Sequence, residues 1–455
     1  MHNKFSTIKT TIEQTMQDYN VPGVAVGIYH NQQIWTAGFG VTSLEMPVSV
    51  TSKTLFQIAS ISKTYTSTLI MRLVEAEKLS LDTPIKSYIP ELKLKDQATE
   101  ANLTLRHILT HTAGFAGDTC VFKDFGAGDD ALSKMLAELV NVPQDFPLGS
   151  LVSYNNAGFS IAGYVIAKVM KQPFEEVMQE WLFKPLGLTN SYFFFKDFFM
   201  HSYAVPYDEN DDKKLEPVKI WGCGRAANPA GGIVTHVEDM LRYAQFHLKN
   251  GTTVSGESVL SPANVQLMQQ QQVKMNAEIA LGLSWFIEEI DGVKMISHGG
   301  GVPGHISYLM LVPAAQTALV MLTSSSSGGK LMEQVKEVFN ETYLGLKKKQ
   351  PDPIQAVTPE QRQAYIGQYA NADGMVISEI KQEQDDLIWH FILSGEMLKM
   401  ANKKKFPPCT MKFVGDDSWY LFEGETRLPF KITSVRDEKG NVVRLNAGRL
   451  LTKIS

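Results

Sequence analysis

A serine and a lysine three residues apart could form the reactive centre of this chain. The segment Ser60-Ile-Ser-Lys63 follows the short apolar stretch 54–59. It leads into residues 63–79, where the spacing of the apolar residues predicts a helix. Ser60 would then lie at the helix N-terminus, where free backbone N–H groups favour developing negative charge. Lys63 would lie one turn later on the same face, and a desolvated lysine that has lost its proton can activate a hydroxyl. The pair predicts a serine nucleophile that forms an acyl-enzyme.

The spacing by itself is weak, because Ser-x-x-Lys also occurs at Ser6–Lys9, Ser327–Lys330 and Ser378–Lys381. The alternative for Ser60 is an ordinary helix N-cap. Further motifs are therefore needed to separate Ser60 from a chance match.

Two further motifs follow Ser60 in the chain. Tyr154-Asn-Asn156 lies in a polar turn before a helical run, and His298-Gly299-Gly300-Gly301 follows the strand-like segment 293–297. In order and spacing the three motifs resemble those of the penicillin-recognising serine hydrolases, which are Ser-x-x-Lys, a Tyr or Ser two residues before Asn, and Lys-Thr-Gly or a variant.

The chain is identified as a member of the class C β-lactamase-like family, which also contains penicillin-binding proteins, D-Ala-D-Ala carboxypeptidases, D-aminopeptidases and esterases. The resemblance covers about residues 5–345 and includes three segments outside the motifs, at 104–114, 181–188 and 228–234. Some members carry a C-terminal lipocalin-like β-domain, and Tyr365-Ile-Gly-Gln-Tyr369 resembles its opening.

The resemblance assigns a role to each motif residue. Ser60 attacks an acyl carbonyl, and Lys63 and Tyr154 form the proton-transfer pair; which of the two is the base stays open. Asn156 hydrogen-bonds the substrate amide or holds Lys63. Backbone N–H groups of Ser60 and Gly301 bind the oxyanion.

The third motif bears on the substrate. His298 and Gly299 stand where β-lactamases of this class have a lysine and a threonine that hold the carboxylate of the drug, and we expect His298 to face the pocket. A neutral histidine and a glycine supply less charge and one hydroxyl fewer. Together with Gly300 and Gly301 these residues are predicted to bind the substrate.

We therefore predict a serine hydrolase that cleaves an amide or ester bond in a peptide, a D-amino acid derivative, an ester or a β-lactam. The alternatives are a dedicated class C-type β-lactamase and a non-catalytic penicillin-binding or structural protein. The physiological substrate and its stereochemistry stay open.

Composition adds limits on partners and location. A formal net charge of −5 argues against nucleic acid as a partner, and the absence of an apolar stretch of 18 residues argues against a membrane span. Three cysteines cannot build a disulfide framework, and residues 1–8 lack the apolar core of a signal peptide. We expect a cytoplasmic protein, or an exported one whose signal peptide has been removed; homo-oligomerisation stays open.

No metal or cofactor is predicted. Gly299-x-Gly301-x-x-Gly304 fits a dinucleotide fingerprint, but a strand-like segment follows it where a helix is needed. His107-x-x-x-His111 has the spacing of metal ligands on a helix, but it lacks the glutamate of His-Glu-x-x-His. Cys120 is expected to be a free thiol.

The expected fold class is α/β: a β-lactamase-like antiparallel sheet with flanking helices and an inserted helical subdomain, plus a C-terminal antiparallel β-barrel domain. Strands are predicted at 23–29, 33–38, 282–289, 293–297, 306–312 and 318–322, with helices dominating 61–270 and a closing helix at 330–343. The predicted domains are a hydrolase domain at 1–346, a linker at 347–356 and a lipocalin-like barrel at 357–455, in which we identify six strand candidates. The barrel would serve packing or oligomerisation, or act as a lid that filters substrates near Ser60.

Overall fold

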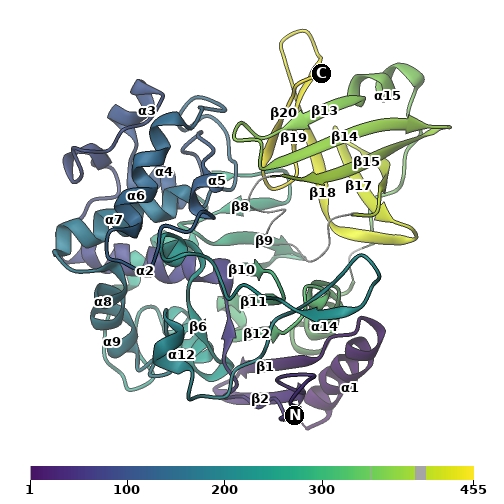
Figure 1. Ribbon diagram of the computed structural model, residues 1–455. Coiled ribbons are helices and arrows are strands. Elements are labelled where there is room, and N and C mark those ends of the chain that lie inside the picture. The colour runs from purple at the N-terminus through teal and green to yellow at the C-terminus, as the bar shows by residue number, and fades with distance from the viewer. Residues whose placement is uncertain (1, 349, 395–405) are drawn as a thin grey trace.

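An N-terminal hairpin and six later strands form one antiparallel sheet in the order β2-β1-β12-β11-β10-β9-β8-β7 (Figure 1). The computed structural model describes residues 2–348, 350–394 and 406–455. The strands of this sheet are β1 (Gly23–His30), β2 (Gln33–Gly40), β7 (Val273–Lys274), β8 (Ile279–Leu281), β9 (Phe286–Ile290), β10 (Val293–Val302), β11 (His305–Val312) and β12 (Thr317–Thr323).

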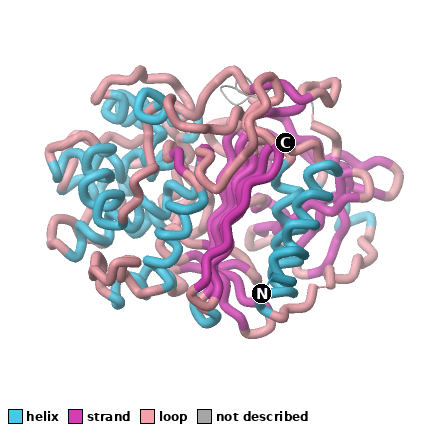
Figure 2. The backbone as a smooth tube through the Cα atoms, turned by 90° about the horizontal axis from the view of Figure 1, so that it is seen from below, coloured by secondary structure: helices cyan, strands magenta, loops and turns pink. Residues whose placement is uncertain are grey.

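Both faces of this sheet are covered, and the central strand β12 is therefore apolar along its length. Leu319 and Met321 belong to the hydrophobic cluster on one face, and Val320 and Leu322 to the cluster on the other, as the two-residue period of a strand requires. Helices α1 (His2–Asp18) and α14 (Gly328–Phe339) cover the first face, where Figure 2 shows them side by side against the strands.

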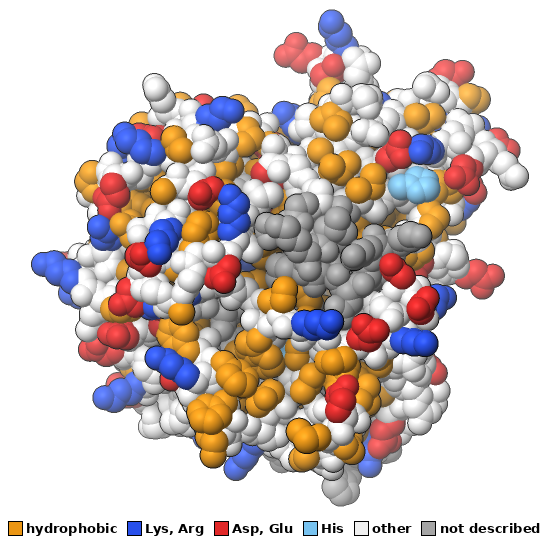
Figure 3. Space-filling view, in the orientation of Figure 1, with side chains coloured by type: hydrophobic (Ala, Val, Ile, Leu, Met, Phe, Trp, Pro, Cys, Tyr) orange, Lys and Arg blue, Asp and Glu red, His pale blue; other side chains and the backbone are white. Residues whose placement is uncertain are grey.

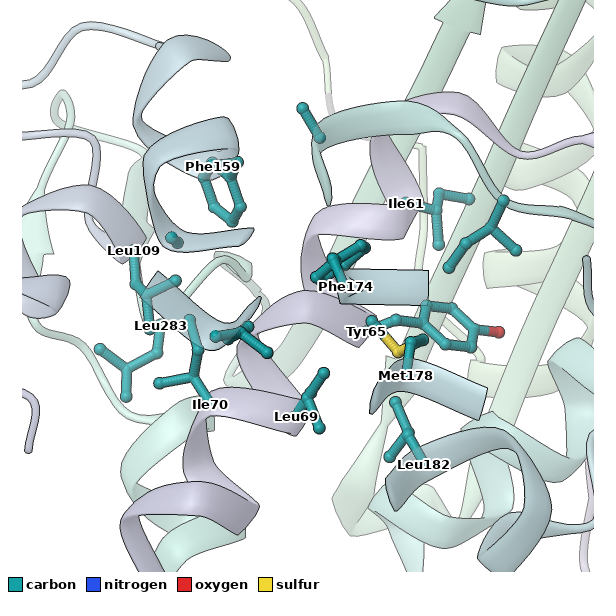
Figure 4. Packing of buried hydrophobic residues seen from close by; sticks show 14 of the residues in the cluster. Ile61, Tyr65, Leu69, Ile70, Leu109, Phe159, Phe174, Met178, Leu182 and Leu283 are labelled. Atoms are coloured by element: carbon teal, nitrogen blue, oxygen red, sulfur yellow. The ribbon is translucent and has the colours of Figure 1, made fainter. Parts of the chain in front are cut away.

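A helical block covers the other face, with α2 (Ser62–Glu75) at its centre. Ile61 and the α2 residues Tyr65, Leu69 and Ile70 pack in the core that Figure 4 displays. The other helices on this side are α3 (Gln97–Asn102), α4 (Leu105–Leu109), α5 (Asp118–Val121), α6 (Ala131–Glu138), α7 (Ala157–Met170), α8 (Phe174–Met178), α9 (Lys184–Leu186), α10 (Phe195–Phe198), α11 (Asn228–Gly231), α12 (Val237–Leu248) and α13 (Pro262–Gln269). Two small ribbons pair β3 (Phe56–Gln57) with β6 (Val234–Thr235) and β4 (Tyr207–Glu209) with β5 (Leu215–Pro217).

The C-terminal part is a closed antiparallel barrel of eight strands with its own hydrophobic cluster. Pairing of its first and last strands closes it. Its elements are α15 (Pro359–Tyr365), β13 (Gly367–Ala370), β14 (Val376–Glu383), β15 (Asp386–Leu393), β16 (Cys409–Gly415), β17 (Ser418–Glu423), β18 (Thr426–Arg436), β19 (Val442–Asn446) and β20 (Leu450–Lys453).

The predicted fold class is confirmed, with differences in detail. The predicted strand at 282–289 begins only at Phe286, and the helix predicted to reach residue 79 ends at Glu75. Residue 365 ends helix α15 instead of opening a strand, because Thr358 and Gln361 form a capping box around Pro359 that starts a helix. The short strands β19 and β20 were not predicted.

The barrel docks on the helical block through its turns. Asp373, in the turn before β14, accepts hydrogen bonds of 3.1 Å from the backbone N–H groups of Gly117 and Thr119 at the start of α5. The turn between β19 and β20 reaches the polar segment before α7, where the N–H of Leu450 donates to Ser153 Oγ at 3.1 Å. Residues more than 250 positions apart in the chain therefore meet at this interface.

No helix among the described residues is long and apolar enough to cross a membrane. On the face shown in Figure 3, basic and acidic side chains are interspersed, without a large area of one sign.

Candidate active site

The turn before the predicted nucleophile is held rigidly. Ala59 has a φ of +47°, a left-handed conformation that costs a residue with a Cβ atom about 1–2 kcal/mol. Its neighbour Ile58 is fixed on both sides, because its N–H donates to the carbonyl of Ile233 at 3.0 Å and its carbonyl accepts from Ser307 Oγ at 2.8 Å. Ser60 follows in the single turn η1 (Ala59–Ile61), directly before α2, and lines a cavity of about 490 Å³.

Lys63 points at this serine from one turn further along. Its Nζ lies 3.1 Å from Ser60 Oγ and donates to the carbonyl oxygen of Ala230 at 2.7 Å. The side chain is fully buried, and burial is the main reason that the pKa of Lys63 falls to about 7. The amine is therefore partly unprotonated at neutral pH and can accept a proton.

Tyr154 lies on the other side of the lysine, with its ring centroid 4.9 Å from Lys63 Nζ. Burial raises the pKa of Tyr154 above its usual value, although a hydrogen bond with Ser60 opposes the shift. Its ring stacks on that of His111 at 4.5 Å, and its backbone N–H donates to the carbonyl of Gly448 in the barrel at 3.1 Å. The phenol therefore keeps its proton at neutral pH and is positioned by both parts of the chain.

Asn156 also lines the cavity, and its side chain is held by a carboxylate. Its Nδ2 donates to Asp118 Oδ2 at 3.0 Å, and its backbone N–H donates to Asp118 Oδ1 at 2.7 Å. The same Oδ2 accepts from Arg449 Nε at 3.1 Å and from Arg449 Nη2. Asp118 therefore fixes the side chain of Asn156 in the cavity wall, and both contacts predicted for Asn156, with Lys63 or with the substrate amide, stay predictions.

The third motif lies within strand β10, which continues through its glycines. Strand β9 pairs with β10 only as far as Ser297, so this edge of the strand is open next to η1. Gly300 must lack a side chain, because a Cβ atom there would lie 2.2 Å from the carbonyl oxygen of Ile58. Gly301 lines the cavity together with Ser60 and Tyr154. The fold thus brings all three motifs to one cavity.

His298 lies deeper than the sequence suggested. Its side chain is buried rather than part of the cavity lining, with its ring 5.2 Å from that of Phe286 and 6.3 Å from that of Tyr154. Its Nδ1 is 2.6 Å from the carbonyl oxygen of Gly299. Burial and the nearby Lys63 lower the pKa of His298 to about 3, so the ring is neutral. His298 therefore brings no positive charge to this part of the site.

The two histidines of the rejected metal motif make structural contacts, and two cysteines have buried thiols. His107 caps helix α4 through Thr104, and His111 Nδ1 accepts from the N–H of Asn155 at 3.1 Å. Burial raises the pKa of the Cys120 thiol and raises that of Cys223, which lines the cavity, to about 11. These thiols stay protonated at neutral pH, which makes them poor nucleophiles.

Comparison with known proteins agrees with the three motifs. A family model described as Beta-lactamase matches residues 8–338. This chain belongs to the beta-lactamase family. It is 30% identical over 330 residues to penicillin-binding protein 4 of Amycolatopsis lactamdurans, covering 71% of this chain and 85% of that protein. The next relative, a beta-lactamase of Lysobacter lactamgenus, is 32% identical over 245 residues, but the match spans only 59% of its length.

Solved structures with a similar fold extend the likeness to the barrel. The crystal structure of SurE matches with a TM-score of 0.75 at 22% identity, over 100% of both chains. An octameric penicillin-binding protein homologue from Pyrococcus abyssi matches with a TM-score of 0.67 at 20% identity, over 98% of this chain and 100% of that one. At these identities the likeness establishes the fold alone.

Two residues of this beta-lactamase-family site were missed by sequence reasoning. Asp118 and Arg449 are 331 positions apart, and neither stands in a recognisable motif. The pair matters electrostatically, because Asp118 raises the pKa of Lys63 whereas Arg449 lowers it. The guanidinium of Arg449 also lies 5.2 Å from the ring centroid of Tyr154. The barrel thus contributes a charged group to the site.

Replacing Arg449 with methionine should shift the pH dependence of activity to higher pH. The variant removes the charge that lowers the pKa of Lys63 and leaves Asp118, which raises that pKa, without its ion-pair partner. Stability should also fall, by less than the about 3–5 kcal/mol of a fully buried pair, because 27% of the Arg449 side chain is exposed. A pH profile of kcat/KM and a thermal melt measure the two effects.

The matched control is Asp118→Asn, which should shift the profile in the opposite direction, since Arg449 then acts on Lys63 alone. The double variant should return the midpoint toward that of the wild type. Midpoints that move in the same direction in both single variants would contradict this electrostatic account.

Proposed function

We propose that this chain is a serine hydrolase that cleaves an amide or ester bond through an acyl-enzyme on Ser60. One observation carries the proposal: Ser60, Tyr154 and Gly301, from three separate motifs, line a single cavity, with Lys63 Nζ 3.1 Å from Ser60 Oγ. Membership of the beta-lactamase family supports the same reaction class.

Acylation follows from the protonation states of the two buried groups. Neutral Lys63 accepts the proton of Ser60 as Oγ attacks the carbonyl carbon, and the oxyanion is bound by the N–H groups of Ser60 and Gly301. The phenol of Tyr154 then donates its proton to the leaving nitrogen or oxygen, and the lysine ammonium returns a proton to the phenolate. The lowered pKa of Lys63 and the raised pKa of Tyr154 support this assignment of base and acid.

Deacylation reverses these roles with water in place of the leaving group. Water loses a proton to the same pair as it attacks the acyl carbon, and Ser60 Oγ regains a proton when the ester bond breaks. Asn156, held by Asp118, is positioned to hydrogen-bond the amide of a substrate in the cavity.

The substrate is expected to be an uncharged ester or amide more often than a β-lactam. The position of the usual lysine carries neutral, buried His298, which offers no charge to the carboxylate of a drug. Activity against a panel of esters, D-aminoacyl amides, D-Ala-D-Ala peptides and β-lactams tests the proposal. Turnover of any member supports a hydrolase, highest kcat/KM for a β-lactam would favour a dedicated β-lactamase, and no turnover of any member would favour a non-catalytic protein.

The rate should depend on the protonation of Lys63. Because neutral lysine is the base, kcat/KM should rise with pH, with a midpoint near 7, and level off above it. Below the midpoint it should fall about tenfold per pH unit, as for loss of one essential proton acceptor. Initial rates with a neutral ester between pH 5 and 9 measure this, and a flat or falling profile would exclude neutral Lys63 as the base.

Homo-oligomerisation stays a prediction for this chain. The Pyrococcus abyssi homologue is described as octameric, and it matches along almost the whole of this chain. Light scattering of the purified protein would determine the mass of the assembly.

A further inference from the structure

The cavity at Ser60 does not end at the hydrolase part of the chain. Beyond Ser60 and Tyr154 its wall is formed by inward-facing residues of the barrel, among them Val376, Trp389, Phe391, Leu421, Leu428 and Ile432. In Figure 1 the barrel stands next to the helical block, with α15 on its far side. An eight-stranded barrel has an interior that side chains fill or that holds one small ligand.

The packing divides the barrel interior into two parts. Near α15 the fully buried rings of Tyr365 and Trp419 fill it, with their centroids 4.9 Å apart. Toward Ser60 the inward-facing side chains line the cavity instead, and apolar atoms dominate the lining of the cavity as a whole. A volume of about 490 Å³ lies within the range of about 300–1,000 Å³ that is usual for small-molecule sites.

A polar atom without a partner is directed into this space. Ser378 on β14 lines the cavity and is fully buried, and its hydroxyl has no hydrogen-bond partner among the described residues. Its cross-strand neighbour is Phe391, which lines the same cavity. Buried hydroxyls are normally paired, so an unpaired one in a cavity wall indicates a ligand that supplies the partner.

The charged groups of the cavity do not compete for an apolar ligand. Arg449 is paired with Asp118, and Glu423 lies 3.9 Å from Lys330. Both acidic–basic pairs join the barrel to the hydrolase part. Among the described residues, the deeper lining offers apolar surface and one hydroxyl without a hydrogen-bond partner, that of Ser378.

We propose that the barrel lumen receives an extended apolar group of the substrate, with Ser378 hydrogen-bonding a polar atom of that group, so that long-chain esters or amides are the preferred substrates. This inference rests on the proposed hydrolysis at Ser60, because the same cavity holds the scissile bond. Each methylene buried in the lumen should raise kcat/KM by about fourfold until the lumen is full.

The kinetic test compares nitrophenyl esters of straight acyl chains, from acetyl to decanoyl, and a second series with the chain in the alcohol. Val376→Trp places a large ring in the lumen and should lower the ratio of kcat/KM for the decanoyl over the acetyl ester at least tenfold. Ile377→Trp is the matched control, because Ile377 is the next residue of β14 and lies outside the cavity lining. A flat chain-length dependence in both series would overturn the proposal.

A binding test does not depend on turnover. The neutral fluorophore N-phenyl-1-naphthylamine should bind Ser60→Ala saturably at one site, equally in Ile377→Trp and at least tenfold more weakly in Val376→Trp. Binding that is absent, or equal in the two tryptophan variants, would overturn the proposal. Leu428→Trp replaces Val376→Trp if thermal melts show that the latter does not fold. If the acetyl ester is hydrolysed but kcat/KM does not depend on chain length and the fluorophore does not bind, the proposed function is supported. Only the proposed lumen site is then contradicted.

Discussion

Replacing Ser60 with alanine should lower kcat for a nitrophenyl ester by a factor on the order of 10⁶, to the rate left by binding and the oxyanion site. The variant removes the oxygen atom that forms the acyl bond in the proposed mechanism, whereas Lys63 and Tyr154 stay buried. Stopped-time assays of the purified variant against the wild type, at saturating ester, measure the loss.

Ser62→Ala is the control for this experiment. Ser62 lies two residues on, is fully buried, and its Oγ accepts from the N–H of Ile233 at 3.1 Å. Loss of this hydroxyl should lower the free energy of unfolding by about 1–3 kcal/mol and leave kcat within a few-fold of the wild-type value. A Ser60→Ala variant as active as Ser62→Ala would place the nucleophile elsewhere.

Replacing Tyr154 with phenylalanine should lower kcat/KM for alkyl esters and amides by about 10²–10⁴-fold. The raised pKa keeps the phenol protonated, so the variant loses the proton donor of the leaving group but keeps the ring that stacks on His111. A nitrophenolate leaves without a proton. The value of kcat/KM for a nitrophenyl ester should therefore fall much less than that for an alkyl ester. The measurement is the ratio of kcat/KM for an alkyl ester over a nitrophenyl ester, in variant and wild type.

Equal losses for both esters would contradict the role of Tyr154 as the acid. They would indicate that the phenolate is instead needed in the attack of Ser60, which is the base assignment that the sequence left open. Lys63→Met should lower kcat/KM for the alkyl ester and the nitrophenyl ester by similar factors, whether Tyr154 is the acid or the base.

The sequence predicted the fold class and the three motifs because these depend on local patterns. Ser60 and Lys63 are one helical turn apart, and the strand preceding His298 is apolar with short connections, so residue type and spacing were enough. The depth of His298 was not predictable, since it depends on how Phe286 and Tyr154 pack around it.

The contribution of the barrel to the site was not predictable either. Arg449 and Asp118 come from parts of the chain with separate hydrophobic clusters and lie 331 positions apart, so no local pattern encodes their contact. Strands β19 and β20 are four or five residues long and carry Arg444, Asn446 and Lys453, so they lack a continuous apolar signal. The division into a hydrolase domain at 1–346, a linker at 347–356 and a barrel domain at 357–455 stays a prediction.

The most direct test of the acyl-enzyme is to locate the adduct of a fluorophosphonate. The reagent forms a stable phosphonyl ester with an activated serine as fluoride leaves. Trypsin would release residues 54–63 as one peptide that contains both Ser60 and Ser62, and fragment masses distinguish the two. We expect one adduct per chain, on Ser60, formed faster as pH rises through about 7. An adduct on Ser62 or on another residue, or no adduct on a chain that turns over esters, would contradict it.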